Sequence, residues 1–170
     1  GSADGIASSA ALGPIQTSTR SFSTGANYSY EGAVAQSAGD GLPSSVNNLT
    51  INNTSGVTLA GNVSVNGVLA LSNGKLNTGA NLVTVTATGS SVTGGSSSSY
   101  VNGNLSRAVD AGISTVAFPI GDAGAYAPLS VNFGAGNSAG NLTASTTKPG
   151  VPPAAGNAPV GSGIDQTKYI

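Results

Sequence analysis

Pairs of apolar residues two positions apart recur along the first half of the chain. The pairs are Leu49/Ile51, Val57/Leu59, Val63/Val65, Leu69/Leu71 and Val83/Val85. A spacing of two places both side chains on the same face of a β-strand. The residue between the members of each pair is small or polar, so we expect short strands with one buried face and one solvated face.

The segments between these pairs are rich in glycine and asparagine, which accept left-handed backbone angles at low cost and therefore suit sharp corners. Strands are expected to begin at residues 49, 57, 63, 69, about 76, and 83. Equivalent positions lie 19 or 20 residues apart: Leu49 and Leu69, Val57 and Leu76, Val63 and Val83. Three strands and three corners per repeat predict a parallel β-solenoid of about 20 residues per coil.

A meander of antiparallel hairpins is the competing interpretation. Asn66-Gly67 and Asn73-Gly74 are favourable two-residue hairpin turns. The regular spacing of the apolar pairs favours the solenoid over the meander.

The pattern changes after Gly94-Gly95, where longer spacings and aromatic residues predict a small antiparallel sheet or sandwich-like part. Its expected strands are Tyr100–Asn102, Leu105–Arg107, Ser114–Ile120, Leu129–Phe133 and Leu142–Thr146. The chain thus divides into an N-terminal extended segment (1–21), a β-solenoid (22–95), an antiparallel cap (96–147) and a proline-rich extended tail (148–170). The class is all-β.

The composition of the chain argues against several classes of function. Only 6% of the 170 residues are charged and the formal net charge is −1, so no basic patch indicates a nucleic-acid partner. No apolar run approaches the roughly 20 residues of a membrane-spanning helix. Cysteine is absent, which excludes disulfides and thiolate chemistry. A polar, cysteine-free chain rich in glycine and asparagine suits a protein that is secreted or held at the cell surface.

Catalytic chemistry finds little support in the sequence. Histidine is absent, so a Ser–His–Asp triad is impossible, and zinc has neither histidine nor cysteine ligands. No two acidic residues lie within three positions of each other, and Asp40 and Asp122 are each flanked by glycine in expected turns. We therefore expect no enzyme activity, no catalytic residues, no cofactor and no metal site.

Several motifs resemble those of large surface and secreted proteins of Bacteroidetes-type bacteria. They are Tyr28-Ser-Tyr-Glu-Gly-Ala, Gly41-Leu-Pro, Val46-Asn-Asn-Leu-Thr-Ile-Asn-Asn, Tyr100-Val-Asn-Gly-Asn-Leu, Phe118-Pro-Ile-Gly-Asp and Tyr126-Ala-Pro-Leu. The resemblance covers roughly residues 22–133. It implies an extracellular, repetitive β-structure and supplies no catalytic residues.

The outward residues of the expected strands are the candidates for surface binding. They are Thr50, Thr58, Ser64, Thr84 and Thr86, with Tyr100 as an aromatic platform for a sugar. A stiff lattice of hydroxyl groups suits ice or a polysaccharide, although the periodicity spreads these residues over different faces. Threonine is also simply a good residue for the exposed side of a strand.

Two functions follow from these features. The first is an extracellular structural protein: a building block of a surface layer, an adhesin stalk or a self-assembling filament. It would form a homo-oligomer or filament through the solenoid ends and the terminal segments. The alternative is an extracellular binding module for a polysaccharide or for ice, with glycan as the partner.

Overall fold

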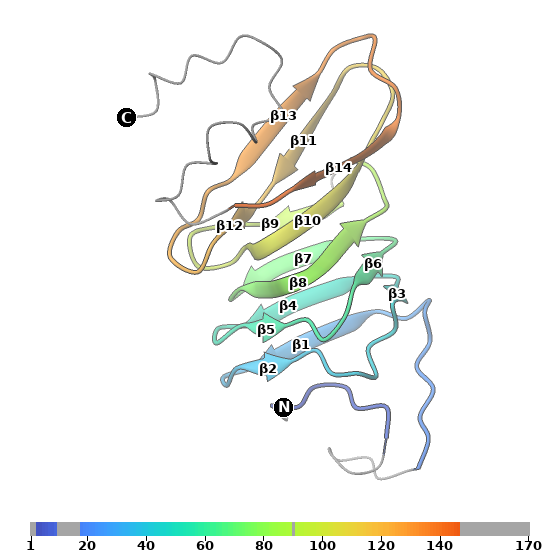
Figure 1. Cartoon of the computed structure of the whole chain (residues 1–170), viewed down its shortest axis with the longest axis vertical. Coiled ribbons are helices and arrows are strands. Elements are labelled where there is room, and N and C mark those ends of the chain that lie inside the picture. The colour runs from blue at the N-terminus through green and yellow to red at the C-terminus, as the bar shows by residue number, and fades with distance from the viewer. Residues whose placement is uncertain (1–2, 10–17, 90, 147–170) are drawn as a thin grey trace, which may run out of the picture.

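A computed structural model describes residues 3–9, 18–89 and 91–146 of the chain. Every regular element in these ranges is a β-strand, which confirms the all-β class. Most strands pair in parallel and wind into a solenoid, and a smaller antiparallel part follows at the C-terminal end of the stack (Figure 1). The proline-rich tail, expected over 148–170, lies outside the described residues.

One wall of the solenoid is a four-stranded parallel sheet in the order β1-β4-β7-β9. Its strands are β1 (Tyr28–Gly32), β4 (Leu49–Asn53), β7 (Leu69–Asn73) and β9 (Val92–Gly94). Each strand lies directly above the preceding one, as the successive colours in Figure 1 show.

The other two walls belong to one eight-stranded sheet. Its strands are β2 (Gln36–Ser37), β3 (Ser45–Val46), β5 (Val57–Thr58), β6 (Val63–Val65), β8 (Leu76–Val85), β10 (Val101–Val109), β12 (Ile120–Gly121) and β14 (Gly140–Ala144). The first halves of β8 and β10 continue the wall begun by β2 and β5, and their second halves continue the wall begun by β3 and β6.

The predicted 20-residue repeat is confirmed by the strand register. Three pairs are in direct register, as the sequence predicts: Leu49 with Leu69, Val57 with Leu76, and Val63 with Val83. The competing hairpin interpretation is wrong, because the strands on either side of Asn66-Gly67 and of Asn73-Gly74 pair in parallel with other coils. These dipeptides form corners of the solenoid.

Stacking the coils places like residues above one another inside the solenoid. The inward columns are Tyr28-Leu49-Leu69-Val92, Tyr30-Ile51-Leu71, Gln36-Val57-Leu76-Val101-Ile120, Val63-Val83-Leu105 and Val46-Val65-Val85-Arg107. Most of their members are almost fully buried and form one hydrophobic cluster. Continuous burial of apolar area is the main favourable term in the stability of such a stack.

The parallel pairing continues beyond residue 95, where the sequence had suggested a change to antiparallel structure. Tyr100–Asn102 and Leu105–Arg107, expected as separate strands of the antiparallel part, lie mostly within the single strand β10. This strand pairs in parallel with β8 and so forms another coil, and β12 adds a further parallel rung. The offsets from Leu76 to Val101 and from Val83 to Leu105 are 25 and 22 residues, so a long connection obscures the repeat.

The antiparallel part is smaller than expected but present. Strand β11 (Ser114–Phe118) pairs with β13 (Leu129–Phe133) in a two-stranded ribbon. Strand β14 runs antiparallel to the second half of β10 and ends that wall of the solenoid. Figure 1 shows the ribbon standing at the end of the stack opposite β1 and β2.

Residues 3–9 lie against the outer edge of the first coil. The Ser37 amide donates to the Ala3 carbonyl at 2.7 Å, and the Ile6 amide donates to the Ala38 carbonyl at 3.1 Å. The sequence predicts an extended N-terminal segment, but residues 3–9 contain turns and bends, with a φ of 67° at Gly5. They cover the edge of β2.

Candidate binding surfaces

Two of the hydroxyl residues singled out from the sequence share one column. Ser64 of β6 and Thr84 of β8 are in register, with Ser45 of β3 before them and Ser106 of β10 after them. Parallel strands lie about 4.8 Å apart, so the column presents hydroxyl groups at that spacing. Ser106 is 4% exposed, and the accessible part of the column therefore ends at Thr84.

The other hydroxyl candidates lie elsewhere. Thr50 is on the β1-β4-β7-β9 wall between Ser29 and Ala70, and Thr58 is on the β2-β5 wall. Thr86 follows β8 at a corner, where its Oγ1 lies 3.0 Å from Asn66 Oδ1 and donates to it. Thr50 and Thr58 therefore do not combine with Ser64 and Thr84 into one surface, whereas Thr86 lies beside the column, two residues after Thr84.

Tyr100 is not a platform for a sugar. Its side chain is 1% exposed, and its hydroxyl donates to the Asp122 carbonyl at 2.6 Å. The ring of Tyr126 lies 5.5 Å from its own, and the ammonium group of Lys75 lies 5.0 Å from its centroid. A turn formed more than twenty residues later in the chain thus encloses Tyr100, and nothing local in the sequence reveals this.

The corners carry ladders of asparagine side chains, consistent with the corner role that the sequence suggests. Asn48 Nδ2 donates to Asn27 Oδ1 at 2.9 Å, and Asn73 Nδ2 donates to Asn52 Oδ1 at 2.6 Å. Asn53 is fully buried and donates to Gln36 Oε1 at 2.7 Å. Each bond joins one coil to the next, so the corners stabilise the stack in addition to the strands.

The two acids examined as metal ligands both have local roles. Asp122 accepts from the amides of Gly124 and Ala125 at 2.7 and 2.9 Å, which closes a turn. Asp40 accepts from the hydroxyl and the amide of Ser8 at 2.6 and 2.9 Å. These hydrogen bonds from Ser8 lower the pKa of Asp40 below its ordinary value. Within the described ranges, no three acidic residues gather as metal ligands would.

Arg107 is a buried cation that the sequence analysis missed. It is 4% exposed and occupies the inward position above Val85. Its Nη1 donates to the Ala117 carbonyl at 2.5 Å, and its Nη2 donates to the Gly89 carbonyl at 2.7 Å and to Ser91 Oγ at 3.1 Å. Burial lowers the pKa of the guanidinium group. Arg107 therefore ends one aliphatic column and ties the ribbon to a solenoid corner.

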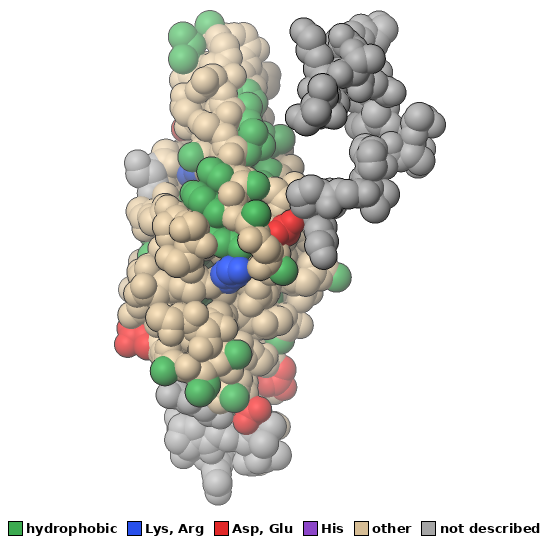
Figure 2. All heavy atoms as spheres, turned by 90° about the vertical axis from the view of Figure 1, so that its left-hand side faces the viewer, with side chains coloured by type: hydrophobic (Ala, Val, Ile, Leu, Met, Phe, Trp, Pro, Cys, Tyr) green, Lys and Arg blue, Asp and Glu red, His purple; other side chains and the backbone are tan. Residues whose placement is uncertain are grey.

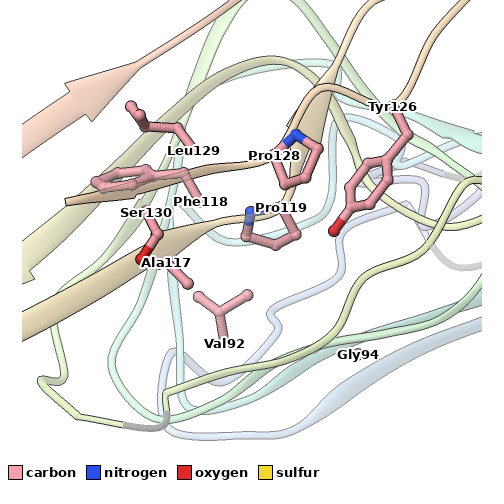
Figure 3. A pocket seen from close by; sticks show the side chains of 9 residues that line it. All are labelled: Val92, Gly94, Ala117, Phe118, Pro119, Tyr126, Pro128, Leu129 and Ser130. Carbon is pink, nitrogen blue, oxygen red and sulfur yellow. The ribbon is translucent and has the colours of Figure 1, made fainter.

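A shallow cleft of about 240 Å³ lies between β9 and the ribbon. In the view of Figure 3, Pro119 and Pro128 lie between Tyr126 on one side and Phe118 on the other. No charged side chain lines it, and its volume is below the roughly 300–1,000 Å³ of typical small-molecule sites. Figure 2 shows a patch of hydrophobic side chains on one face of the molecule, with few charges around it.

Comparison of the chain with protein-family models, with curated proteins and with solved structures found no match. Among the described residues, none belongs to a helix with the length and apolar character needed to span a membrane.

Proposed function

We propose that this chain is an extracellular structural module: a building block of a surface layer, an adhesin stalk or a filament. The observation that carries the proposal is the stacking of inward columns from β1 to β10, which stay aligned despite local register shifts at Ile51/Asn52 and at Asn102/Asn104. Each coil is buried against the next, so the stack resists bending and separates what is attached to its two ends by a fixed distance.

Side-chain ladders support this mechanical role. Aliphatic columns fill the interior, and asparagine bonds such as Asn48 to Asn27 and Asn73 to Asn52 join successive coils at the corners. A charged fraction of 6% and surfaces dominated by serine, threonine and asparagine suit an extracellular setting. The resemblance of residues 22–133 to bacterial surface proteins points the same way.

The ends of the stack leave room for assembly. In the described part of the chain, β1 and β9 each have a strand partner on one side only, at opposite ends of the same wall. An unpaired strand edge is a template for pairing with another chain. The other walls are covered in part, by residues 3–9 at one end and by β14 at the other.

Negative-stain electron microscopy of the purified chain over a range of concentrations tests the proposal. We expect rods, stacked subunits or sheets whose number increases with concentration. A population that stays strictly monomeric at every concentration, confirmed by analytical ultracentrifugation, contradicts the assembling role.

A binding module for a polysaccharide or ice is the second candidate, and the Ser45-Ser64-Thr84 column favours it. Pull-down with insoluble polysaccharides and a thermal-hysteresis assay test this candidate. Thr84→Tyr is expected to abolish binding because it covers the column, whereas Thr50→Tyr on another wall is the matched control. Equal binding by both variants rejects the column as the site.

A further inference from the structure

Residues 3–9, here called the strap, are docked on the first coil by a ladder of backbone hydrogen bonds. Ser37 donates to Ala3, Ile6 donates to Ala38, and the Gly41 amide donates to the Ile6 carbonyl at 2.7 Å. The strap thus occupies the outer edge of β2 and of the loop that follows it.

Glycines on both sides of this contact allow a very close approach. A Cβ atom at Gly5 of the strap would collide with the Ser37 carbonyl, and a Cβ atom at Gly39 of the coil would collide with the Ile6 backbone. Both glycines have left-handed angles, with φ of 67° and 83°. The sequence therefore encodes a fitted pair of surfaces, one on the strap and one on the coil.

Side chains add to the backbone contacts. Asp40 accepts two hydrogen bonds from Ser8, and the side chain of Ile6 packs against the hydrophobic core of the solenoid. Arg20 Nη1 donates to the Ala7 carbonyl at 2.9 Å and secures the strap from the other side.

The strap and the first strand of the solenoid are far apart in sequence. Residues 10–17 lie outside the described part of the chain, and the residues just before β1 have contacts of their own, since the Asn47 amide donates to the Ala26 carbonyl at 2.9 Å. The chain from Ser9 to Ser18 spans at most about 30 Å, which is enough to reach a copy that lies against the same edge. The same contacts can therefore form between two copies, with no new complementary surface required.

We propose that the outer edge of the first coil is an exchange site that accepts the strap of a second copy. This inference rests on the proposed assembling role, because it names the partner and the surface through which copies join. In dilute solution the covalently attached strap occupies its own coil, since its local concentration is high. At high concentration, exchange of straps links the copies.

Two glycine variants of the full chain separate donor from acceptor. Gly5→Ala damages the strap and leaves the acceptor edge intact, whereas Gly39→Ala damages the edge and leaves the strap intact. Gly89→Ala and Gly112→Ala are matched controls, because those glycines have φ of 68° and 82° with no heavy atom near the added carbon.

The experiment mixes isotope-labelled Gly5→Ala chain with unlabelled Gly39→Ala chain. Alone, the Gly5→Ala chain is expected to lose hydrogen-exchange protection at the Ser37 and Gly41 amides by about tenfold or more. The mixture is expected to regain this protection and to form a 1:1 complex by ultracentrifugation. The Gly89→Ala and Gly112→Ala control variants keep their own straps docked. Mixing either variant with one of these controls is therefore expected to give less of the 1:1 complex than mixing Gly5→Ala with Gly39→Ala.

Two results overturn the inference. One is full protection of Ser37 in the Gly5→Ala chain, which means that the strap does not depend on that contact. The other is loss of protection that the Gly39→Ala chain does not restore at millimolar concentration. Assemblies of the wild-type chain in the microscope, together with either result, would leave the proposed structural role standing and reject strap exchange alone.

Discussion

The solenoid and the β11–β13 ribbon are both built from short strands of alternating apolar and polar residues. The two regions nevertheless differ in how fully they bury their apolar side chains. Leu49 and Leu69 in the solenoid are 0% exposed, whereas Leu129 in the ribbon is 43% exposed. A solenoid strand has neighbours above and below and an opposite wall to pack against. The ribbon has one strand partner and one packed face, so alternation alone does not ensure a dry interior.

The largest difference is expected from truncating leucine in the two regions. Leu69→Ala leaves a cavity in a continuous column and should lower the free energy of unfolding by about 2–5 kcal/mol. Leu129→Ala removes a half-exposed side chain and should cost less than about 1 kcal/mol. Urea denaturation measures both, and equal losses would contradict the contrast between the two regions.

The next largest loss of stability is expected from changing Arg107, which connects the ribbon to the solenoid. Arg107→Lys keeps a cation, but a single ammonium group cannot replace the guanidinium bonds to Ala117 and Gly89, which are on different segments. We expect a loss of about 1.5–3 kcal/mol in unfolding free energy, with faster hydrogen exchange in β11. Unchanged exchange in β11 would show that Arg107 does not hold the ribbon.

Two neighbouring asparagines allow a buried side-chain hydrogen bond to be compared with an exposed one at the same corner. Asn53 is fully buried and bonds to Val34 and Gln36, so Asn53→Ala should cost about 1–3 kcal/mol by leaving polar groups unpaired. Asn52 forms an exposed bond to Asn73, and Asn52→Ala should cost about 0.5 kcal/mol or less. Thermal denaturation compares the pair, and a reversed order would reject the role of burial.

The smallest expected effect is the pH dependence of the contact between Ser8 and Asp40 at the first coil. Hydrogen bonds from Ser8 lower the pKa of Asp40 below its ordinary value of 3.8, so the contact is stabilising above that pH. It is lost as the pH falls through the lowered pKa. An NMR titration of the Ser8 amide should show a transition below pH 3.8 that is absent in Asp40→Asn. A transition at or above the ordinary value would contradict the contact.

The sequence predicts the coils where the repeat is regular. Leu49, Leu69 and their equivalents are spaced by one coil, and periodic apolar residues have few ways to be buried together. The prediction fails after residue 95, because a longer connection precedes β10, which joins the stack as a further parallel coil. Arg107 hides this coil as well, since a charged residue at an inward position breaks the apolar alternation.

The candidate surfaces were less predictable than the coils. Which outward residues share a wall depends on where each corner turns, so Ser64 and Thr84 align while Thr50 and Thr58 face elsewhere. Burial of Tyr100 depends on the distant turn at Asp122. Such contacts carry no local signal in the sequence.

Native-state hydrogen exchange tests the central claim, that the stacked columns form one cooperative and rigid unit. We expect the slowest amides of β4, β7 and β8 to exchange with a single shared free energy of opening, while amides of β11 and β13 exchange faster. Coils that open independently, or a ribbon protected as strongly as the coils, would contradict the claim.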